Sequence, residues 1–244
     1  MLESLKKWFS PSDGLARSGD LRSVATWAQG QKWTFRRVRE SDGFVIDGRW
    51  GDTPWRLEWG PSQRSYVTTH ELRLRVELKV AWDLQVLVLN RELQEAMEKD
   101  VYDQYIEGVQ TRVDTRTPPE MRWLVMFPKL SGHEMKSLRE RWAAVGNYKP
   151  WLQQWLEGSL SQKLSGHTLE AGTPMALMIS RGRLTLRTAL AEPDRAAMEA
   201  ALELLEVAWR AGERVAADYT EPLSPSTEPS LFSATELPED ATAH

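Results

Sequence analysis

The sequence predicts an α+β fold, in which an antiparallel, twisted sheet is packed by several helices and a long C-terminal helix is followed by a disordered acidic tail. Segments with apolar residues at every second position, typical of half-buried strands, cluster between residues 33 and 89. Segments with apolar residues three or four positions apart, typical of helices, dominate the second half. The two kinds do not alternate regularly, which favours a segregated α+β fold over a doubly wound parallel sheet.

The composition is that of a globular protein and excludes several classes of site. The 244 residues include no cysteine, which excludes disulfides, thiolate nucleophiles, zinc–thiolate sites and iron–sulfur clusters. No apolar run approaches the roughly 20 residues of a membrane span, and no apolar stretch at the N-terminus resembles a secretory signal. We therefore expect a cytoplasmic protein of bacterial type; a peripheral location at the inner membrane surface is the alternative.

The chain divides into three expected parts. Residues 1–19 are an amphipathic segment and loop, residues 20–218 a single α+β domain, and residues 219–244 a disordered, acidic, proline-rich tail. Two domains that meet near residue 112 are the alternative. From Glu192 onward there are 12 acidic and 3 basic residues, whereas residues 1–191 hold 28 basic and 23 acidic ones. This mildly basic body is too weakly charged for a typical nucleic-acid-binding domain, so nucleic acid is an unlikely partner.

The N-terminal segment combines apolar and basic residues at helical spacing. The apolar side of this segment consists of Leu2, Leu5, Trp8 and Phe9. We expect it to pack onto the domain; the alternative is a weak, reversible contact with a membrane surface or a partner groove. Residues 10–31 are rich in serine, glycine and aspartate and are expected to form a loop that leads into a short stretch at 23–29.

Five strands are predicted in the first part of the chain. They lie within residues 33–35, 44–50, 55–59, 70–80 and 84–89. The fourth is the clearest, since Leu72, Leu74 and Val76 alternate with Arg73 and Arg75. The fifth is almost continuously apolar, which indicates a strand that is covered on both faces.

The remaining segments predict helices, one more strand and a hairpin. Helices are expected over 91–108, over about 135–145, from 147 to 164 and over 194–218, the last continuing through Gly212. A strand is expected over 121–127, and a hairpin over 175–189 that turns at Arg181 and Gly182.

No motif in the sequence assigns a reaction. The chain has no Gly-x-Ser-x-Gly, no Gly-x-Gly-x-x-Gly and no P-loop, and we expect no cofactor. His70, His133, His167 and His244 lie far apart, so we expect no metal site and interpret them as surface histidines.

Paired carboxylates support a hydrolase only as a third hypothesis. Asp100, Asp103 and Glu107 share one side of a predicted helix, and Glu58 and Glu77 are candidates for neighbours across strands. A catalytic carboxylate needs a buried environment to raise its pKa, and nothing in the helical pattern indicates burial. We therefore expect no catalytic residues and consider an enzyme the less favoured class.

Arginine and tryptophan are concentrated in the predicted sheet. Guanidinium groups bind carboxylates and phosphates, and aromatic faces stack on cations and bases. The candidate binding residues are Arg49, Trp50, Arg56, Arg64, Tyr66, Arg73 and Arg75. The leading hypothesis is a non-enzymatic adaptor that binds a protein partner on this sheet face. The alternative is a receptor for a small anionic ligand or nucleotide on the same face, and the simplest interpretation is an ion-paired, water-facing sheet.

Twelve tryptophans are unusual for this length. We expect the core to contain Trp33, Trp55, Trp59, Trp123, Trp142, Trp155 and Trp209. The pattern gives no inner partner for Trp8, Trp50, Trp82 and Trp151, which makes them candidates for an interface.

Overall fold

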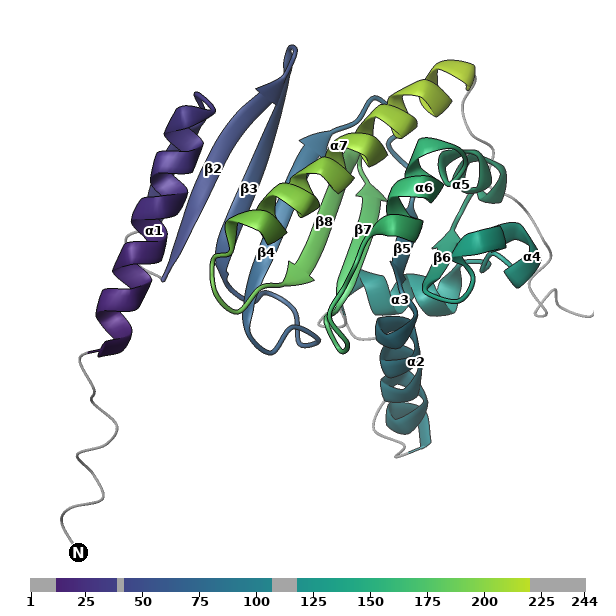
Figure 1. The fold of residues 1–244 in the computed structure, drawn as a ribbon. Coiled ribbons are helices and arrows are strands. Elements are labelled where there is room, and N and C mark those ends of the chain that lie inside the picture. The colour runs from purple at the N-terminus through teal and green to yellow at the C-terminus, as the bar shows by residue number, and fades with distance from the viewer. Residues whose placement is uncertain (1–11, 39–41, 107–117, 220–244) are drawn as a thin grey trace, which may run out of the picture.

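A computed structural model of the chain describes residues 12–38, 42–106 and 118–219. These residues form an eight-stranded antiparallel sheet with helices packed on it, in the strand order β1-β2-β3-β4-β8-β7-β5-β6 (Figure 1). The predicted α+β class, antiparallel sheet and long C-terminal helix are confirmed. The predicted anchor residues Leu2, Leu5, Trp8 and Phe9, and the tail from residue 220 onward, lie outside the described residues.

The strands agree with most of the alternating segments of the sequence. They are β1 (Thr34–Val38), β2 (Gly43–Trp50), β3 (Thr53–Pro61), β4 (His70–Glu77), β5 (Val86–Asn90), β6 (Trp142–Gly146), β7 (Met175–Ser180) and β8 (Arg183–Ala189). Along β4, Leu72, Leu74 and Val76 are buried, whereas Arg73 and Arg75 are more exposed. β5 is buried along its whole length, as its continuous apolar run predicts.

The helices lie mainly in the second half of the chain. They are α1 (Ser12–Gly30), α2 (Arg91–Ile106), α3 (Pro119–Met126), α4 (Gly132–Met135), α5 (Lys149–Trp155), α6 (Ser159–Gly166) and α7 (Arg195–Asp218), with a 3-10 helix at Lys136–Leu138. The carboxylate of Asp194 caps α7 by accepting a hydrogen bond from the backbone N–H of Ala197 at 2.7 Å. α7 continues through Gly212 as predicted, and a Cβ there would meet the Leu78 side chain at 3.0 Å.

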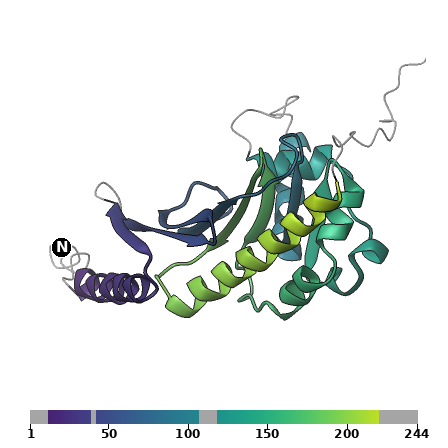
Figure 2. The same cartoon turned by 90° about the horizontal axis from the view of Figure 1, so that it is seen from above.

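Two hydrophobic cores lie on opposite faces of the sheet. The larger core, which includes Leu57 and Leu205, joins the sheet to α1, α5, α6 and α7. The smaller core, which includes Leu89 and Met97, joins β5, β6 and β7 to α2 and α3. In Figure 2, α7 runs along one face of the sheet, whereas no described helix covers the opposite side of β1, β2, β3, β4 and β8. We call this uncovered side the outer face.

The prediction of a loop over residues 10–31 is wrong for the described part of that range. Residues 12–30 form α1, which lies beside β1 (Figure 1). Leu21, Val24 and Trp27 are buried, and the Trp27 ring meets the Trp33 ring edge-on at 5.2 Å. Glycine and serine lower the intrinsic helix propensity of this segment, so its stability depends on packing that local composition does not reveal.

Two short apolar segments have the opposite secondary structure to that predicted. Residues 119–126 form the helix α3 and not a strand, and Trp142–Gly146 form the strand β6 and not part of a helix. A run of five to eight mostly apolar residues is compatible with both the helical period of 3.6 and the strand period of 2. Tertiary pairing decides between them: β6 pairs with β5, where Leu87 lies opposite Val145, and α3 buries Met121 against α2.

The helix predicted from 147 to 164 consists of two helices. α5 ends at Trp155 and α6 begins at Ser159, with Gly158 between them at a φ of 65°. This left-handed conformation is favourable mainly for glycine, so Gly158 permits the chain to change direction there.

Two tryptophans predicted to lack an inner partner, Trp151 and Trp50, pack on the core side of the sheet. Trp151 is 1% exposed and packs on Trp155, so it belongs to the core. Trp50 is half-buried and stacks on Trp209, whereas Trp82 is 71% exposed. Trp8 lies outside the described residues.

The contact between Gly48 and Trp55 gives a testable prediction for the sheet. These residues lie opposite each other on β2 and β3, and a Cβ at Gly48 would overlap three atoms of the Trp55 ring. Gly48→Ala should lower the free energy of unfolding by about 1–3 kcal/mol, because the ring cannot move without disturbing Trp33 and Trp50. Urea unfolding measures the loss. The control is Gly30→Ala, whose Cβ meets nothing within 4 Å; equal midpoints for the two variants would contradict the prediction.

Candidate functional site

The outer face carries guanidinium and carboxylate groups side by side. Side chains alternate between the two sides of each strand. In β1, β2, β3, β4 and β8, one set enters the larger core and the other set projects from the outer face. Its basic members are Arg36, Arg49, Arg56, Arg73, Arg75, Arg183 and Arg187, and its acidic members are Asp47, Glu58, Glu71 and Glu77. Basic groups therefore outnumber acidic groups on this face.

Two carboxylates organise the exposed part of the outer face. Asp47 accepts hydrogen bonds from Arg56, whose Nε lies 2.6 Å from Oδ1, and from Arg36. Partial burial raises the pKa of the Asp47 carboxyl, but the two guanidinium groups outweigh this effect and hold that pKa below its ordinary value. Glu58 forms ion pairs with Arg73 at 3.3 Å and Arg75 at 3.1 Å.

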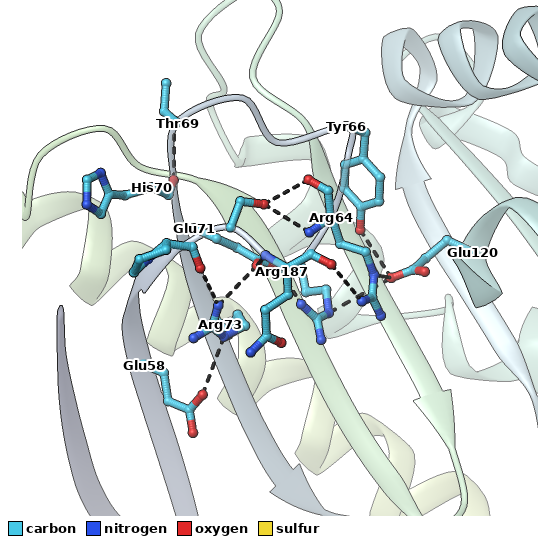
Figure 3. Close-up of polar contacts among 12 residues, drawn as sticks. Glu58, Arg64, Tyr66, Thr69, His70, Glu71, Arg73, Glu120 and Arg187 are labelled. Atoms are coloured by element: carbon cyan, nitrogen blue, oxygen red, sulfur yellow. Dashed lines mark hydrogen bonds and ion pairs between the residues drawn. The ribbon is translucent and has the colours of Figure 1, made fainter. Parts of the chain in front are cut away.

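A buried ion cluster lies at the end of this face, where β4 begins (Figure 3). Glu71 is fully buried, and its carboxylate accepts hydrogen bonds from Arg73 at 3.1 Å and from Arg187. The backbone N–H of Gln63 donates a further bond to Glu71 at 2.9 Å. This bond and the 3.1 Å bond from Arg73 to the carbonyl of Pro61 fix the loop between β3 and β4 against the sheet.

The second carboxylate of the cluster comes from the helix α3. Glu120 of α3 is fully buried and accepts hydrogen bonds from Arg64 Nε at 2.9 Å and from the Tyr66 hydroxyl at 3.1 Å. Burial and the adjacent Glu120 raise the pKa of the Tyr66 phenol well above its ordinary value, so the hydroxyl stays protonated and donates. The Glu71–Glu120 cluster thus links the β3–β4 loop to α3. Sequence analysis missed Glu120, which lies directly before the strand predicted over 121–127.

The structure places the candidate binding residues at four positions. Arg56, Arg73 and Arg75 lie together on the outer face, and Arg64 and Tyr66 lie in the β3–β4 loop. Arg49, at the end of β2, donates a hydrogen bond to the carbonyl of Asp52. Trp50 lies on the opposite side of the sheet, packed on Trp55 and Trp209.

The expectation that arginines and indoles share one face is therefore wrong. Alternation along a strand places them on opposite sides: Trp55 and Trp59 enter the core, and Arg56 between Trp55 and Leu57 projects outward. The carboxylate pairs proposed from the sequence also differ. Glu58 contacts arginines of β3 and β4, whereas Glu77 pairs with Arg183 at 2.8 Å.

A cleft of about 650 Å³ lies on the α7 side of the sheet, at the N-terminal end of α7. Its walls are the first turns of α7, the 167–174 loop that precedes β7, the end of β8 and the β3–β4 loop. This volume lies within the range of small-molecule sites in proteins. The 167–174 loop is held firmly: Asn90 donates to the carbonyl of Thr173 at 3.2 Å, and Gly172 N–H donates to Glu92 at 2.8 Å.

His167 lines this cleft. It was predicted to be a surface histidine, and that prediction is wrong. It is 9% exposed at the end of α6. Burial lowers the pKa of its imidazole, and the nearby positive charges of Lys163 and Arg141 lower that pKa further. The ring is therefore neutral at neutral pH.

The remaining predicted features do not form a site in the described part of the chain. Asp100 and Asp103 of α2 are exposed, and Glu107 lies outside the described residues. Within residues 12–38, 42–106 and 118–219, no group of three or more His, Asp or Glu side chains could hold a metal ion. Among the helices that the structure describes, none combines the length and the apolar character that crossing a bilayer requires.

Comparisons with known proteins identify the fold and no family. No family model matches the chain, and no curated protein sequence matches it significantly. Among solved structures, it is similar to the mycobacterial trehalose monomycolate transport factor A, TtfA, with a TM-score of 0.50 and 9% sequence identity. The similarity covers 85% of this chain and 99% of TtfA. At this identity the comparison shows a shared fold alone.

Proposed function

We propose that this chain is a non-enzymatic binding protein whose outer face docks an acidic surface of a protein partner. The observation that carries the proposal is the outer face of five strands, which holds seven guanidinium groups and four carboxylates, with Arg73, Arg187 and Glu71 mostly or fully buried at its border. Opposite charge across an interface guides association and selects the partner.

Three exposed guanidinium groups of the outer face each have an ion-pair partner on the same face. The side chains of Arg36, Arg75 and Arg183 are 57%, 43% and 49% exposed, and each is oriented by an ion pair with a carboxylate of the same face. A partner that binds such prearranged groups orders few side chains, which reduces the entropic cost of binding. The Glu71–Glu120 cluster supports the same surface by fixing its border.

The similarity to TtfA supports a binding role over catalysis, because that neighbour is described as a transport factor. The proposal places the protein in the cytoplasm, with a secondary, weak contact of the N-terminal segment with the inner membrane surface. We favour this proposal over the alternative, a receptor that binds a small anionic ligand on the outer face. The 650 Å³ cleft includes none of Arg56, Arg73 or Arg75 in its lining, so the arginines of the outer face do not serve that cleft.

Site-specific photocrosslinking in the native host tests the docking surface. A photoreactive amino acid at Val45, which lies between Arg36 and Glu58 on the outer face, should yield a discrete adduct with a protein partner. The double variant Arg56→Glu/Arg75→Glu should reduce the adduct more than about tenfold, because like charges would oppose an acidic partner. An adduct that survives this double reversal would contradict the proposal.

The control variant is Arg210→Glu on α7. Arg210 is also an exposed arginine with an ion-pair partner, Glu206, but it lies on the opposite side of the sheet. We expect the adduct at Val45 to be unchanged in this variant. Circular dichroism of all three proteins confirms that the substitutions leave the fold intact.

A further inference from the structure

We propose that the cleft at the N-terminal end of α7 is a second binding site, which takes an uncharged, hydroxyl-bearing amphiphile such as an alkyl glycoside. The cleft lies on the α7 side of the sheet, whereas the outer face is the opposite side. This inference is therefore independent of the proposed docking function.

Two mostly buried residues line the cleft with polar side chains that have no hydrogen-bond partner in the described part of the chain. The imidazole of His167 and the hydroxyl of Thr188 line it, and these residues are only 9% and 6% exposed. No hydrogen bond within residues 12–38, 42–106 and 118–219 involves either side chain. Neither side chain is among the fully enclosed polar atoms without a partner, so their polar atoms face the water in the cleft and can hydrogen-bond to a ligand that replaces it.

Hydroxyl groups continue around the wall. Thr68, Thr168 and Thr173 also line the cleft, and within the described ranges no side-chain hydrogen bond of theirs occurs. A threonine hydroxyl both donates and accepts, and a neutral imidazole donates from one nitrogen and accepts at the other. Alcohol groups of a ligand have the same two capacities, which makes them suitable partners for this wall.

The charge of the lining disfavours an anion. Among the lining residues that the structure describes there is no lysine or arginine, and the two charged ones are the carboxylates of Glu170 and Asp194. His167 is neutral at neutral pH and adds no positive charge. An anionic headgroup would face these carboxylates without a counterion, whereas an uncharged headgroup avoids that repulsion.

The floor of the cleft accepts an apolar chain. Leu72, Met175 and Leu190 line it beside Ala197 and Ala201 of α7. Alanine on the helix leaves space that a larger side chain would fill, and the volume of about 650 Å³ accommodates a short alkyl chain with one sugar ring.

Calorimetric titration of the full chain with three amphiphiles of equal chain length tests the chemical class. The probes are n-octyl-β-glucoside, sodium octyl sulfate and octyltrimethylammonium bromide, each below its critical micelle concentration. We expect the uncharged glucoside to bind about tenfold or more tightly than the octyl sulfate, which the carboxylates of Glu170 and Asp194 repel. It should also bind more tightly than the trimethylammonium probe, which has no hydroxyl group to pair with the threonine hydroxyls. Equal or tighter binding of a charged probe, or no binding of the glucoside, would overturn the proposal.

Three variants test the location. Ala197→Phe fills the cleft and should abolish glucoside binding, whereas Ala196→Phe, at an exposed neighbouring position outside the lining, should leave it unchanged. Thr188→Val removes one hydroxyl of the cleft wall and should weaken binding about tenfold. Glucoside binding that Ala197→Phe and Thr188→Val leave intact would place the ligand elsewhere and overturn the assignment. If Ala197→Phe unfolds, Thr188→Val decides alone.

Discussion

Glu71→Ala is expected to lower the free energy of unfolding by about 3–5 kcal/mol, the typical cost of breaking a buried ion pair. The Glu71 carboxylate is fully buried and contacts two guanidinium groups, those of Arg73 and Arg187, which are only 15% and 14% exposed. Alanine would leave both positive charges without this partner in a place where water solvates them poorly. The loss measures the penalty for unpaired charge and not the net value of the cluster.

Glu77→Ala is the matched control for this prediction. Glu77 lies on the same strand and the same face, but it and its partner Arg183 are 60% and 49% exposed. Exposed pairs contribute about 0–1 kcal/mol, so this variant should unfold at nearly the wild-type urea concentration. If the two variants share one unfolding midpoint, the buried cluster has no special role in stability.

Trp151→Ala is the second variant with a large expected effect. Trp151 is 1% exposed, and its ring centroid lies 5.5 Å from that of Trp155 between α5 and the larger core. Removal of the indole leaves a large cavity, and such substitutions lower the free energy of unfolding by about 3–5 kcal/mol.

Trp82→Ala provides the comparison, because Trp82 is 71% exposed and the sequence places both tryptophans in the same class. We expect a change within about 0.5 kcal/mol for Trp82→Ala. Thermal unfolding followed by circular dichroism separates the two. Similar melting temperatures would show that Trp151 is not part of the core.

The sequence could predict elements whose periodic pattern is long. β4 alternates over eight residues, and α7 maintains an apolar stripe from Met198 to Val215 on one side. In such segments the periodicity matches one secondary structure alone, so no tertiary information is needed. α3 and β6 are too short for that test, and pairing or packing with distant residues decided their structure.

The candidate site was less accessible to sequence analysis than the fold. Arg56, Arg73 and Arg75 were correctly placed on one face, since alternation fixes the side of each residue in a strand. Glu120 could not be assigned to Arg64, because 56 positions separate the two and α3 brings them together. The cleft likewise combines residues from Tyr66 to Ala201, and no local pattern indicates it.

The amino-acid sequence alone determined the α+β class, the alternation of the main strands, the long C-terminal helix and the excess of arginine on one sheet face. The tertiary structure decided which guanidinium groups meet which carboxylates, which tryptophans are buried and where a cleft opens. The physical reason is the range of the interactions: side-chain alternation and helical periodicity act between near neighbours in the chain. Ion pairing, core packing and cavities depend on which distant segments come into contact.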